Sequence, residues 1–413
     1  MKRPGGSHLE YHLLVLVTLG LVAFGLVMVY SASSARALLS ADAPSYYLKR
    51  QAIYAVMGLV ALVILSRFDF HRLRHATQPL LAVTFVLLVA VLAIGTAVNG
   101  ARRWIPIGFM NFQPSELAKL VLALWTAALL ARRPAPRTLG ELAKPIGVVV
   151  GLACALILIE PDLGTAIAIA IMVSAILVVS GTRIRLLASA TGIATGIVLL
   201  AIWFEPYRRE RIFSFLDPWH DPQGAGFQSV QSMIALGSGG FFGVGLGESV
   251  QKIYYLPEAS TDMIFAIVGE ELGLIGAMGV IAAFAVFAYA GFNIALHCRD
   301  PFGKRLAAGI TTLVCGQAAI NLCAVLGIAP LTGIPLPFVS YGGSSLIVLL
   351  AAVGVLLNIA VNDRVVEARS RDSGRGNSRS HQARSRSRGS TARARSDSDV
   401  RRQPRPRRVA SGS

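Results

Sequence analysis

The sequence predicts an all-α integral membrane protein with about ten transmembrane helices and a large extracytoplasmic loop between spans 7 and 8. Of the 413 residues, 54% are hydrophobic and only 15% are charged, and the mean hydropathy is +0.60. Runs such as 11–35 and 76–101 lack charge for longer than the roughly 20 residues that a bilayer-spanning helix needs. These observations indicate a multi-pass membrane protein.

The individual spans follow from the charge-free segments. The longest such segment, 306–362, contains Pro330, Pro335 and Pro337 near its middle, which favours two spans joined by a tight turn. We expect spans over 12–32, 50–66, 79–98, 115–131, 145–159, 163–181, 186–204, 263–290, 306–329 and 341–361.

Basic residues in the short loops predict the orientation. They precede the first span and follow spans two, four, six and eight, so they share one side of the membrane, which the positive-inside rule assigns to the cytoplasm. Both termini are then cytoplasmic. The first apolar run is longer than the 7–15 residues of a cleavable signal core, so we expect it to remain as an anchor. Arg102 and Arg103 are exceptions on the outer side.

The charge pattern also divides the chain into regions. We expect a cytoplasmic N-terminus over 1–11 and a membrane domain over 12–362, which includes the extracytoplasmic loop 205–261. The segment 363–413 carries 15 arginines against 5 acidic residues, and thus most of the formal net charge of +17. It has few apolar residues, so we predict a disordered cytoplasmic tail that contacts anionic lipid or a protein, with no specific nucleic acid as partner.

Four polar segments interrupt the apolar pattern, and all fall on the predicted outer side. In 102–120, Pro114 and Ser115 are typical of a helix start, and Glu116 and Lys119 share a helix face. This pair is either an ordinary ion pair or part of a site. Arg102 and Arg103 suggest an anionic partner such as a diphosphate, and Trp104 is either an interfacial aromatic or a site residue.

The next two segments are the turn 160–166 and the loop 205–261. The turn EPDLGTA has two carboxylates within three residues, including Asp162, which are either solvated turn charges or functional groups. The loop contains aromatics and glycines, so we expect it to fold as short amphipathic helices. Its glycine series over 237–247 lacks the strand–turn–helix context of a phosphate-binding loop and predicts one only weakly.

The fourth segment, LTGIPLPFVSYGGSS over 331–345, predicts a rigid re-entry. Its serines, Ser344 among them, either donate hydrogen bonds to a substrate or cap a helix.

The strongest functional signal is YLPEASTDMIFAIVGEELG, 255–273. Asp262 stands where the long loop meets an apolar segment, and Glu270 and Glu271 lie within that segment. Ionised carboxylates near hydrocarbon cost roughly 2.5–3.5 kcal/mol each on insertion scales, so they are seldom kept there without a function. This segment predicts chemistry at a membrane surface.

Together, QPSELAK, EPDLGTA, LPEASTDMIFAIVGEELG and PLPFVSYGGSS resemble the SEDS (shape, elongation, division and sporulation) family over residues 10–362. The resemblance implies a ten-span peptidoglycan glycosyltransferase that polymerises lipid II. It implies that Asp262 is catalytic, that Trp104, Glu116 and Glu270 are functionally important, and that Lys119 and Asp162 line the same cavity.

The sequence of the long loop, with FLDPWHDPQGAGFQ and GESVQKIYYLPEA, is more similar to the division branch of the family than to the elongation branch, which implies a role at the septum. Ser260 and Met263 depart from the histidine and phenylalanine that many relatives carry, which affects no proposed acid–base group. The resemblance further implies a class B penicillin-binding protein and other divisome proteins as partners. The chain shows no S-x-x-K motif together with the other transpeptidase motifs, so we expect crosslinking to be done by another protein.

On this basis Asp262 is the expected general base, and Arg102, Arg103, Lys119 or a divalent cation (Mg²⁺ or Mn²⁺) would stabilise the departing diphosphate. A lipid II flippase and a membrane scaffold are the alternatives. Transporters usually place ionisable groups near mid-membrane and often carry inverted repeats, whereas these charges gather toward one face. A scaffold leaves the buried carboxylates without a purpose.

Overall fold

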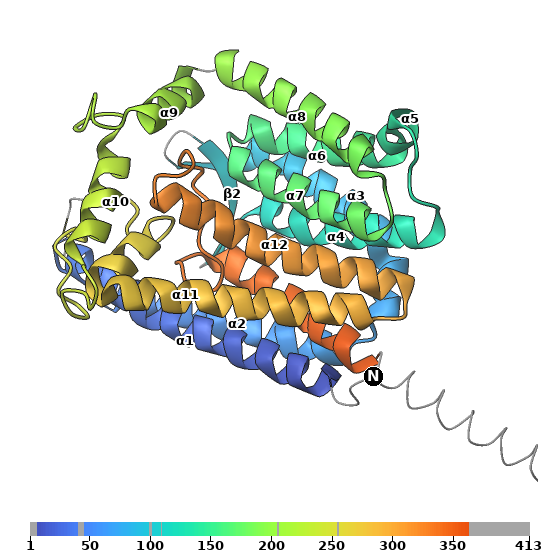
Figure 1. Ribbon diagram of the computed structural model, residues 1–413, viewed down its shortest axis with the longest axis horizontal. Coiled ribbons are helices and arrows are strands. Elements are labelled where there is room, and N and C mark those ends of the chain that lie inside the picture. Colours follow the sequence, from blue (N-terminus) through green and yellow to red (C-terminus); the bar gives the residue numbers. More distant parts are fainter. Residues whose placement is uncertain are drawn as a thin grey trace, which may run out of the picture. The chain divides into compact units, whose positions relative to one another are not determined.

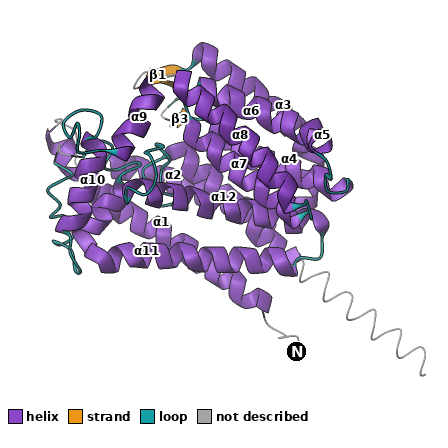
Figure 2. Cartoon of the chain, turned by 45° about the horizontal axis from the view of Figure 1, so that its top comes forward, coloured by secondary structure: helices purple, strands orange, loops and turns teal. Residues whose placement is uncertain are grey.

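The computed structural model describes residues 6–39, 45–98, 101–108, 110–204, 206–253 and 256–362. The predicted disordered tail 363–413 and most of the N-terminal segment 1–11 lie outside these residues. Helices dominate the described chain (Figures 1 and 2), so the predicted all-α membrane fold is confirmed.

Helices occur at all ten expected spans. Nine of those described are long and apolar enough to cross a membrane, and the tenth, α7, has 17 residues. The spans are α1 (Gly6–Leu39), α2 (Tyr46–Arg67), α3 (Phe70–Ile94), α4 (Pro114–Arg132), α5 to α6 (Leu139–Ile159), α7 (Leu163–Val179), α8 (Ile184–Phe204), α11 (Ile264–His297), α12 (Pro301–Val325) and the last helix (Gly343–Asn362). The segment α5 to α6 consists of α5 (Leu139–Leu142), a π-helical turn (Ala143–Gly147) and α6 (Val148–Ile159).

Side-chain caps explain where several helices begin. Asp69 accepts a hydrogen bond from the His71 amide at the start of α3, so this helix begins well before the expected residue 79. Asp162 and Asp300 cap α7 and α12 in the same way. Pro114 opens α4, as predicted, because its missing N–H is not needed in a first turn.

Burial distinguishes the central helices from the peripheral ones. In α4 and the last helix, 78% and 83% of the most apolar window is buried, against 12% in α8. The helix α12 packs against α11, α7 and α4. The helices α4, α7, α12 and the last helix therefore supply a rigid interior, and α8 exposes its apolar side chains outward, as a lipid-facing helix does.

A small antiparallel sheet, which the sequence reading did not predict, joins α3 to α4. Its strands are β1 (Thr96–Val98), β2 (Ala101–Ile107) and β3 (Met110–Phe112) in the order β1-β2-β3. The strand β2 carries Arg102, Arg103 and Trp104. Figure 2 shows the strands at one end of the bundle. The expected third span to residue 98 is therefore too long, since α3 ends at Ile94.

The long loop forms two helices, α9 (Pro206–Leu216) and α10 (Phe227–Ser238), as expected. Figure 1 shows α10 and α5 at opposite ends of the bundle. After α10 the chain turns back onto α11 and forms main-chain hydrogen bonds with it. The amides of Val244 and Gly245 donate to the carbonyls of Glu270 and Glu271 at 3.0 and 3.1 Å, and the Leu274 amide donates to the Gly240 carbonyl at 2.9 Å.

These bonds coincide with a break in α11. Gly273 has φ 64° and ψ −161°, a conformation outside the helical region. The loop approaches so closely that a Cβ on Gly243 would lie 2.1 Å from the Glu271 carbonyl oxygen. The glycines at 239, 243 and 273 therefore serve a close main-chain approach, and no phosphate-binding loop is needed to explain them. Broken membrane helices are stable only when protein satisfies their backbone in this way.

Candidate functional site

Asp262 lies immediately before α11, at its junction with the long loop, and its side chain is half-buried. The Thr261 hydroxyl lies 3.3 Å from Asp262 Oδ1. The Asn321 amide of α12 donates to the Asp262 carbonyl at 2.7 Å and to the Ile334 carbonyl at 2.8 Å. One buried amide thus holds the main chain of Asp262 against the segment that follows α12.

The re-entry that we predicted over 331–345 is a loop over 331–342, because the last helix already begins at Gly343; we call it the 331–342 loop. A Cβ on Gly333 would lie 3.9 Å from Asp262 Oδ2, so Gly333 is next to the carboxylate. The Ser340 hydroxyl accepts from the Leu336 amide at 2.8 Å, and the Tyr341 amide donates to the Ser260 carbonyl at 2.9 Å. These bonds make the loop a fixed wall beside Asp262.

The turn between α6 and α7 meets the same loop from the other side. A Cβ on Gly164 would lie 3.0 Å from the Thr332 carbonyl oxygen and 2.5 Å from the Ile334 side chain. Asp162 accepts from the Thr165 amide at 3.0 Å and from the Gln113 side chain at 3.1 Å. Asp162 is therefore buried at the N-terminus of α7. The turn that carries it contacts Thr332 and Ile334, the two neighbours of Gly333, which lies beside Asp262.

Arg103 reaches this turn from β2. Its Nε donates to the Glu160 carbonyl at 2.8 Å, and its Nη2 donates to the Pro161 carbonyl. Arg102 is exposed and Trp104 is half-buried, where its carbonyl accepts from the Thr96 hydroxyl at 3.2 Å. The two arginines thus differ, since Arg103 fixes the turn and Arg102 faces outward.

Glu116 and Lys119 form a buried ion pair on α4, with 2.8 Å between Nζ and Oε1 and side-chain exposures of 4% and 1%. The second carboxylate oxygen of Glu116 has no hydrogen-bond partner among the described residues. Gln113, at the start of α4, donates its amide to Ser344 Oγ at 3.0 Å, and Ser344 donates to the Asn111 carbonyl at 2.8 Å. Ser344 therefore ties the last helix to β3.

Glu160 has the most perturbed carboxyl outside the spans. It is 1% exposed, and burial, together with the charge of Asp162, raises its pKa to about 8, while Arg103 opposes this shift. Neither of its carboxylate oxygens has a partner among the described residues.

Glu270 belongs to a different group, which we call the loop anchor: Ser31, Ser249, Lys252, Glu270 and Glu271. Glu270 accepts from the Ser249 hydroxyl and from the amides of Val250 and Gln251 at 3.0 and 3.4 Å. Glu271 accepts from Ser31 at 2.6 Å and from Lys252 Nζ at 2.9 Å. The loop anchor binds the long loop to α1 and α11.

The structure thus brings Asp262 and the turn with Asp162 to the 331–342 loop, and Arg103 to that turn. Glu270 instead bonds to the long loop, and Glu116 and Lys119 bond to each other on α4. Two side-chain amides that orient the site, the partly buried Gln113 and the buried Asn321, were not predicted as site residues. For Asn321 the only signal available was a polar residue in an apolar segment. Within the described residues there is no group of three or more His, Cys, Asp and Glu side chains that could hold a metal ion.

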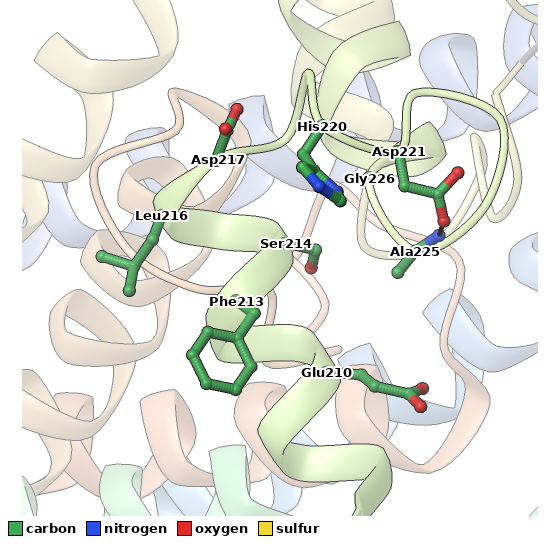
Figure 3. A pocket seen from close by; sticks show the side chains of 9 residues that line it. All are labelled: Glu210, Phe213, Ser214, Leu216, Asp217, His220, Asp221, Ala225 and Gly226. Carbon is green, nitrogen blue, oxygen red and sulfur yellow. Dashed lines mark hydrogen bonds between the residues drawn. The ribbon is translucent and has the colours of Figure 1, made fainter.

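Two cavities lie in the long loop, of about 460 and 290 Å³. The larger, in Figure 3, is lined by Glu210, Phe213 and Ser214 of α9 and by the turn that follows, where Asp221 accepts from the Ala225 amide at 3.1 Å. The smaller is lined in part by Pro257 and Leu331, which begin the two segments that meet at Asp262. The smaller cavity therefore lies near the segments that flank Asp262, although none of the predicted site residues is among the described residues that line it.

Comparison with known proteins agrees with this arrangement. A family model described as a cell cycle protein, for FtsW, RodA and SpoVE, matches residues 11–365. The chain is 41% identical to a “Probable peptidoglycan glycosyltransferase FtsW” of Trichlorobacter lovleyi over 88% of this chain and 97% of the relative. It is 42% identical to “Stage V sporulation protein E” of Bacillus subtilis over 84% and 96%.

Solved structures show the same likeness. One, described as “Structural coordination of polymerization and crosslinking by a peptidoglycan synthase complex”, matches with a TM-score of 0.71 and 31% identity, over 85% of this chain and 97% of that one. The rod shape determining protein RodA of Thermus thermophilus matches with a TM-score of 0.63 and 29% identity, over 85% and 96%. The resemblance seen in the sequence is confirmed: the chain belongs to the SEDS family of FtsW, RodA and SpoVE proteins.

Proposed function

We propose that the protein is a peptidoglycan glycosyltransferase that polymerises lipid II at the outer face of the cytoplasmic membrane. One observation carries the proposal: the half-buried Asp262 and the turn that carries Asp162 both pack against the 331–342 loop, and Arg103 of β2 bonds to that turn. Membership of a family whose relatives are named peptidoglycan glycosyltransferases supports the same activity.

In this mechanism Asp262 is the general base. The 4-hydroxyl oxygen of the acceptor sugar forms a bond to the anomeric carbon of the donor, the bond from that carbon to the diphosphate breaks, and the hydroxyl proton passes to Asp262. Attack opposite to the leaving group inverts the anomeric configuration. The bonds from Asn321 and Thr261 support this role, because a base must be held in reach of its proton.

Stabilisation of the departing diphosphate falls to the arginines of β2. Arg102 is exposed, and among the described residues Arg103 bonds carbonyls only through Nε and Nη2, which leaves Nη1 for a phosphate oxygen. Lys119 is bonded to Glu116 in the described state, so it would reach a phosphate only if that pair opened. Trp104 remains a candidate for direct substrate binding. The other residues predicted to bind substrate would act indirectly: Asp162 and Ser344 hold segments next to the 331–342 loop, and Glu270 holds the long loop on α11. A Mg²⁺ or Mn²⁺ ion would be carried by the diphosphate.

The biological setting that we propose is septal wall synthesis, with both termini cytoplasmic and a class B penicillin-binding protein and other divisome proteins as partners. Relatives named FtsW are 41% and 42% identical to this chain, as is a stage V sporulation protein at 42%, and the division role rests on the FtsW names together with the loop sequence. The similar structure concerned with polymerisation and crosslinking supports a crosslinking partner.

The test is lipid II polymerisation by the purified full-length chain, with and without a class B penicillin-binding protein. We expect glycan strands from the wild type and from Asp217→Asn, an exposed acid of the same loop, and none from Asp262→Asn. Wild-type strand synthesis by Asp262→Asn would remove the proposed base. Lipid II movement across proteoliposomes, with no strands from any variant, would instead indicate a flippase.

A further inference from the structure

Glu160 is a buried acid that the mechanism above does not use. It ends α6, is 1% exposed, and neither carboxylate oxygen has a hydrogen-bond partner within the described residues. An ionised carboxylate without partners is among the most costly groups to bury, whereas the neutral acid is far cheaper. The surroundings of Glu160 therefore suit the protonated form.

The neighbouring arginine supports this view. Arg103 is close enough to bond the main-chain carbonyl of Glu160 at 2.8 Å, and also bonds the carbonyl of Pro161. An ionised carboxylate so near a guanidinium would normally take a two-pronged salt bridge. Here the guanidinium instead satisfies carbonyls at the C-terminal end of α6, which have no partner inside the helix.

The charged groups around Glu160 are few. Asp162, in the same turn, disfavours its ionised form, and Arg103 favours it. Of the elements packed against α6 and α7, α4 contributes Glu116 and Lys119, which are bonded to each other. The helix α12, which packs against α7, carries its charges Lys304 and Arg305 only near its start. The helix α3 carries its charges only near its start, at the end away from this turn. Burial is the largest cause of a pKa that lies at about 8.

The turn 160–164 contacts the 331–342 loop, which lies beside Asp262. Arg103 fixes the carbonyls of 160 and 161, Asp162 caps α7, and Gly164 packs on Thr332 and Ile334, next to Gly333 and Asp262. A change in the bonds of Arg103 would therefore move the wall that faces Asp262.

We propose that Glu160 is a positioning residue that acts as a neutral acid, and that its ionisation draws Arg103 from the carbonyls to the carboxylate and slows polymerisation. The inference rests on the proposed function for its activity readout. In this proposal Glu160 does not contact the substrate and does not act as a base.

The first experiment measures the rate of lipid II polymerisation from pH 6.5 to 9 for wild type, Glu160→Gln and the exposed control Glu141→Gln. Glutamine keeps the neutral shape, so Glu160→Gln should match the wild type at pH 7. At pH 9, one unit above the pKa, about a tenth of Glu160 remains neutral. The wild type and the control should therefore fall about tenfold relative to Glu160→Gln. Parallel pH profiles for all three proteins would overturn the proposal.

The second experiment does not depend on activity. The pKa of Glu160 is raised in the folded state, so its contribution to stability is present below the usual pKa of 4.5 and is lost as the pH rises to about 8. The unfolding temperature of Glu160→Gln minus that of the wild type should grow between pH 4.5 and 8 and then level off. A constant difference would overturn the proposal, even in a protein that makes no strands at any pH. Absence of strands from the wild type would count against the proposed function alone.

Discussion

Two groups of buried carboxylates differ in how their oxygens are satisfied. In the loop anchor, Glu270 has three donors, and Glu271 has a serine and a lysine. In the turn after α6 and in the first turn of α4, Glu160 has no partner for either oxygen and Glu116 has none for Oε2 among the described residues. Both groups lie in segments that resemble family motifs, but of these acids only Glu160 and Glu116 have carboxylate oxygens without a hydrogen-bond donor among the described residues.

This difference distinguishes carboxylates that hold the fold together from carboxylates that can take part in the reaction. A buried acid whose oxygens are all bonded holds two segments together, and here it holds the long loop on α1 and the broken α11. A buried acid with spare oxygens is ready to exchange a proton or a partner, which is typical of functional sites. We therefore expect variants of the loop anchor to lose stability and variants around Asp262 to lose rate.

The largest stability effect should come from Lys252→Met. Removing the ammonium leaves Glu271, which is 0% exposed, without its counter-charge, and breaking such a pair costs about 3–5 kcal/mol. Unfolding in detergent should show this loss, while the exposed control Lys49→Met should be neutral. Equal stabilities of the two variants would mean that the anchor does not hold the loop.

A smaller loss should follow Gly243→Ala. Gly243 has φ +80°, and a Cβ there would meet the main-chain oxygen of Glu271. Strain of this kind costs about 1–3 kcal/mol, and the carbonyl must also shift. Gly237→Ala is the matched control, because its Cβ would meet nothing within 4 Å. Equal unfolding temperatures of the two glycine variants would contradict the claim that the close approach of the loop to α11 requires a glycine at 243.

The smallest loss should come from Asp162→Ala. The substitution removes the α7 cap and the bond from Gln113, and a lost cap costs about 0.5–2 kcal/mol. Asp162→Asn keeps a capping oxygen and should restore most of the stability. Polymerisation should fall in the alanine variant and largely recover in the asparagine variant, since the cap fixes the wall opposite Asp262. Failure of asparagine to recover either quantity would indicate that the charge itself is required.

Much of the fold could be predicted from the sequence, because long charge-free runs fix the positions of spans with little ambiguity. The sheet 96–112 could not, since its strands are short and lie between spans. The break at Gly273 was also hidden, because a glycine in an apolar helix gives no sign of the loop that approaches it.

The candidate site was predictable as a set of acidic segments on one side. Sequence could not show which acids are saturated, because their donors come from distant positions: Ser31 is 240 residues from Glu271. The role of Asn321 depends on main-chain carbonyls of other segments, and that of Gln113 depends on the Ser344 hydroxyl and the Asp162 carboxylate, which no local pattern records.

The most direct test compares two neutral replacements, Asp262→Asn and Glu271→Gln. For each variant, the unfolding temperature and the polymerisation rate per folded molecule are measured on the same preparation. We predict that Asp262→Asn keeps its unfolding temperature and loses about 10²–10⁴-fold in rate, the range attributed to general acid–base catalysis. Glu271→Gln should unfold at a lower temperature and keep its rate while folded. A folded Glu271→Gln protein without activity, or an active Asp262→Asn protein, would contradict the division between anchor and site.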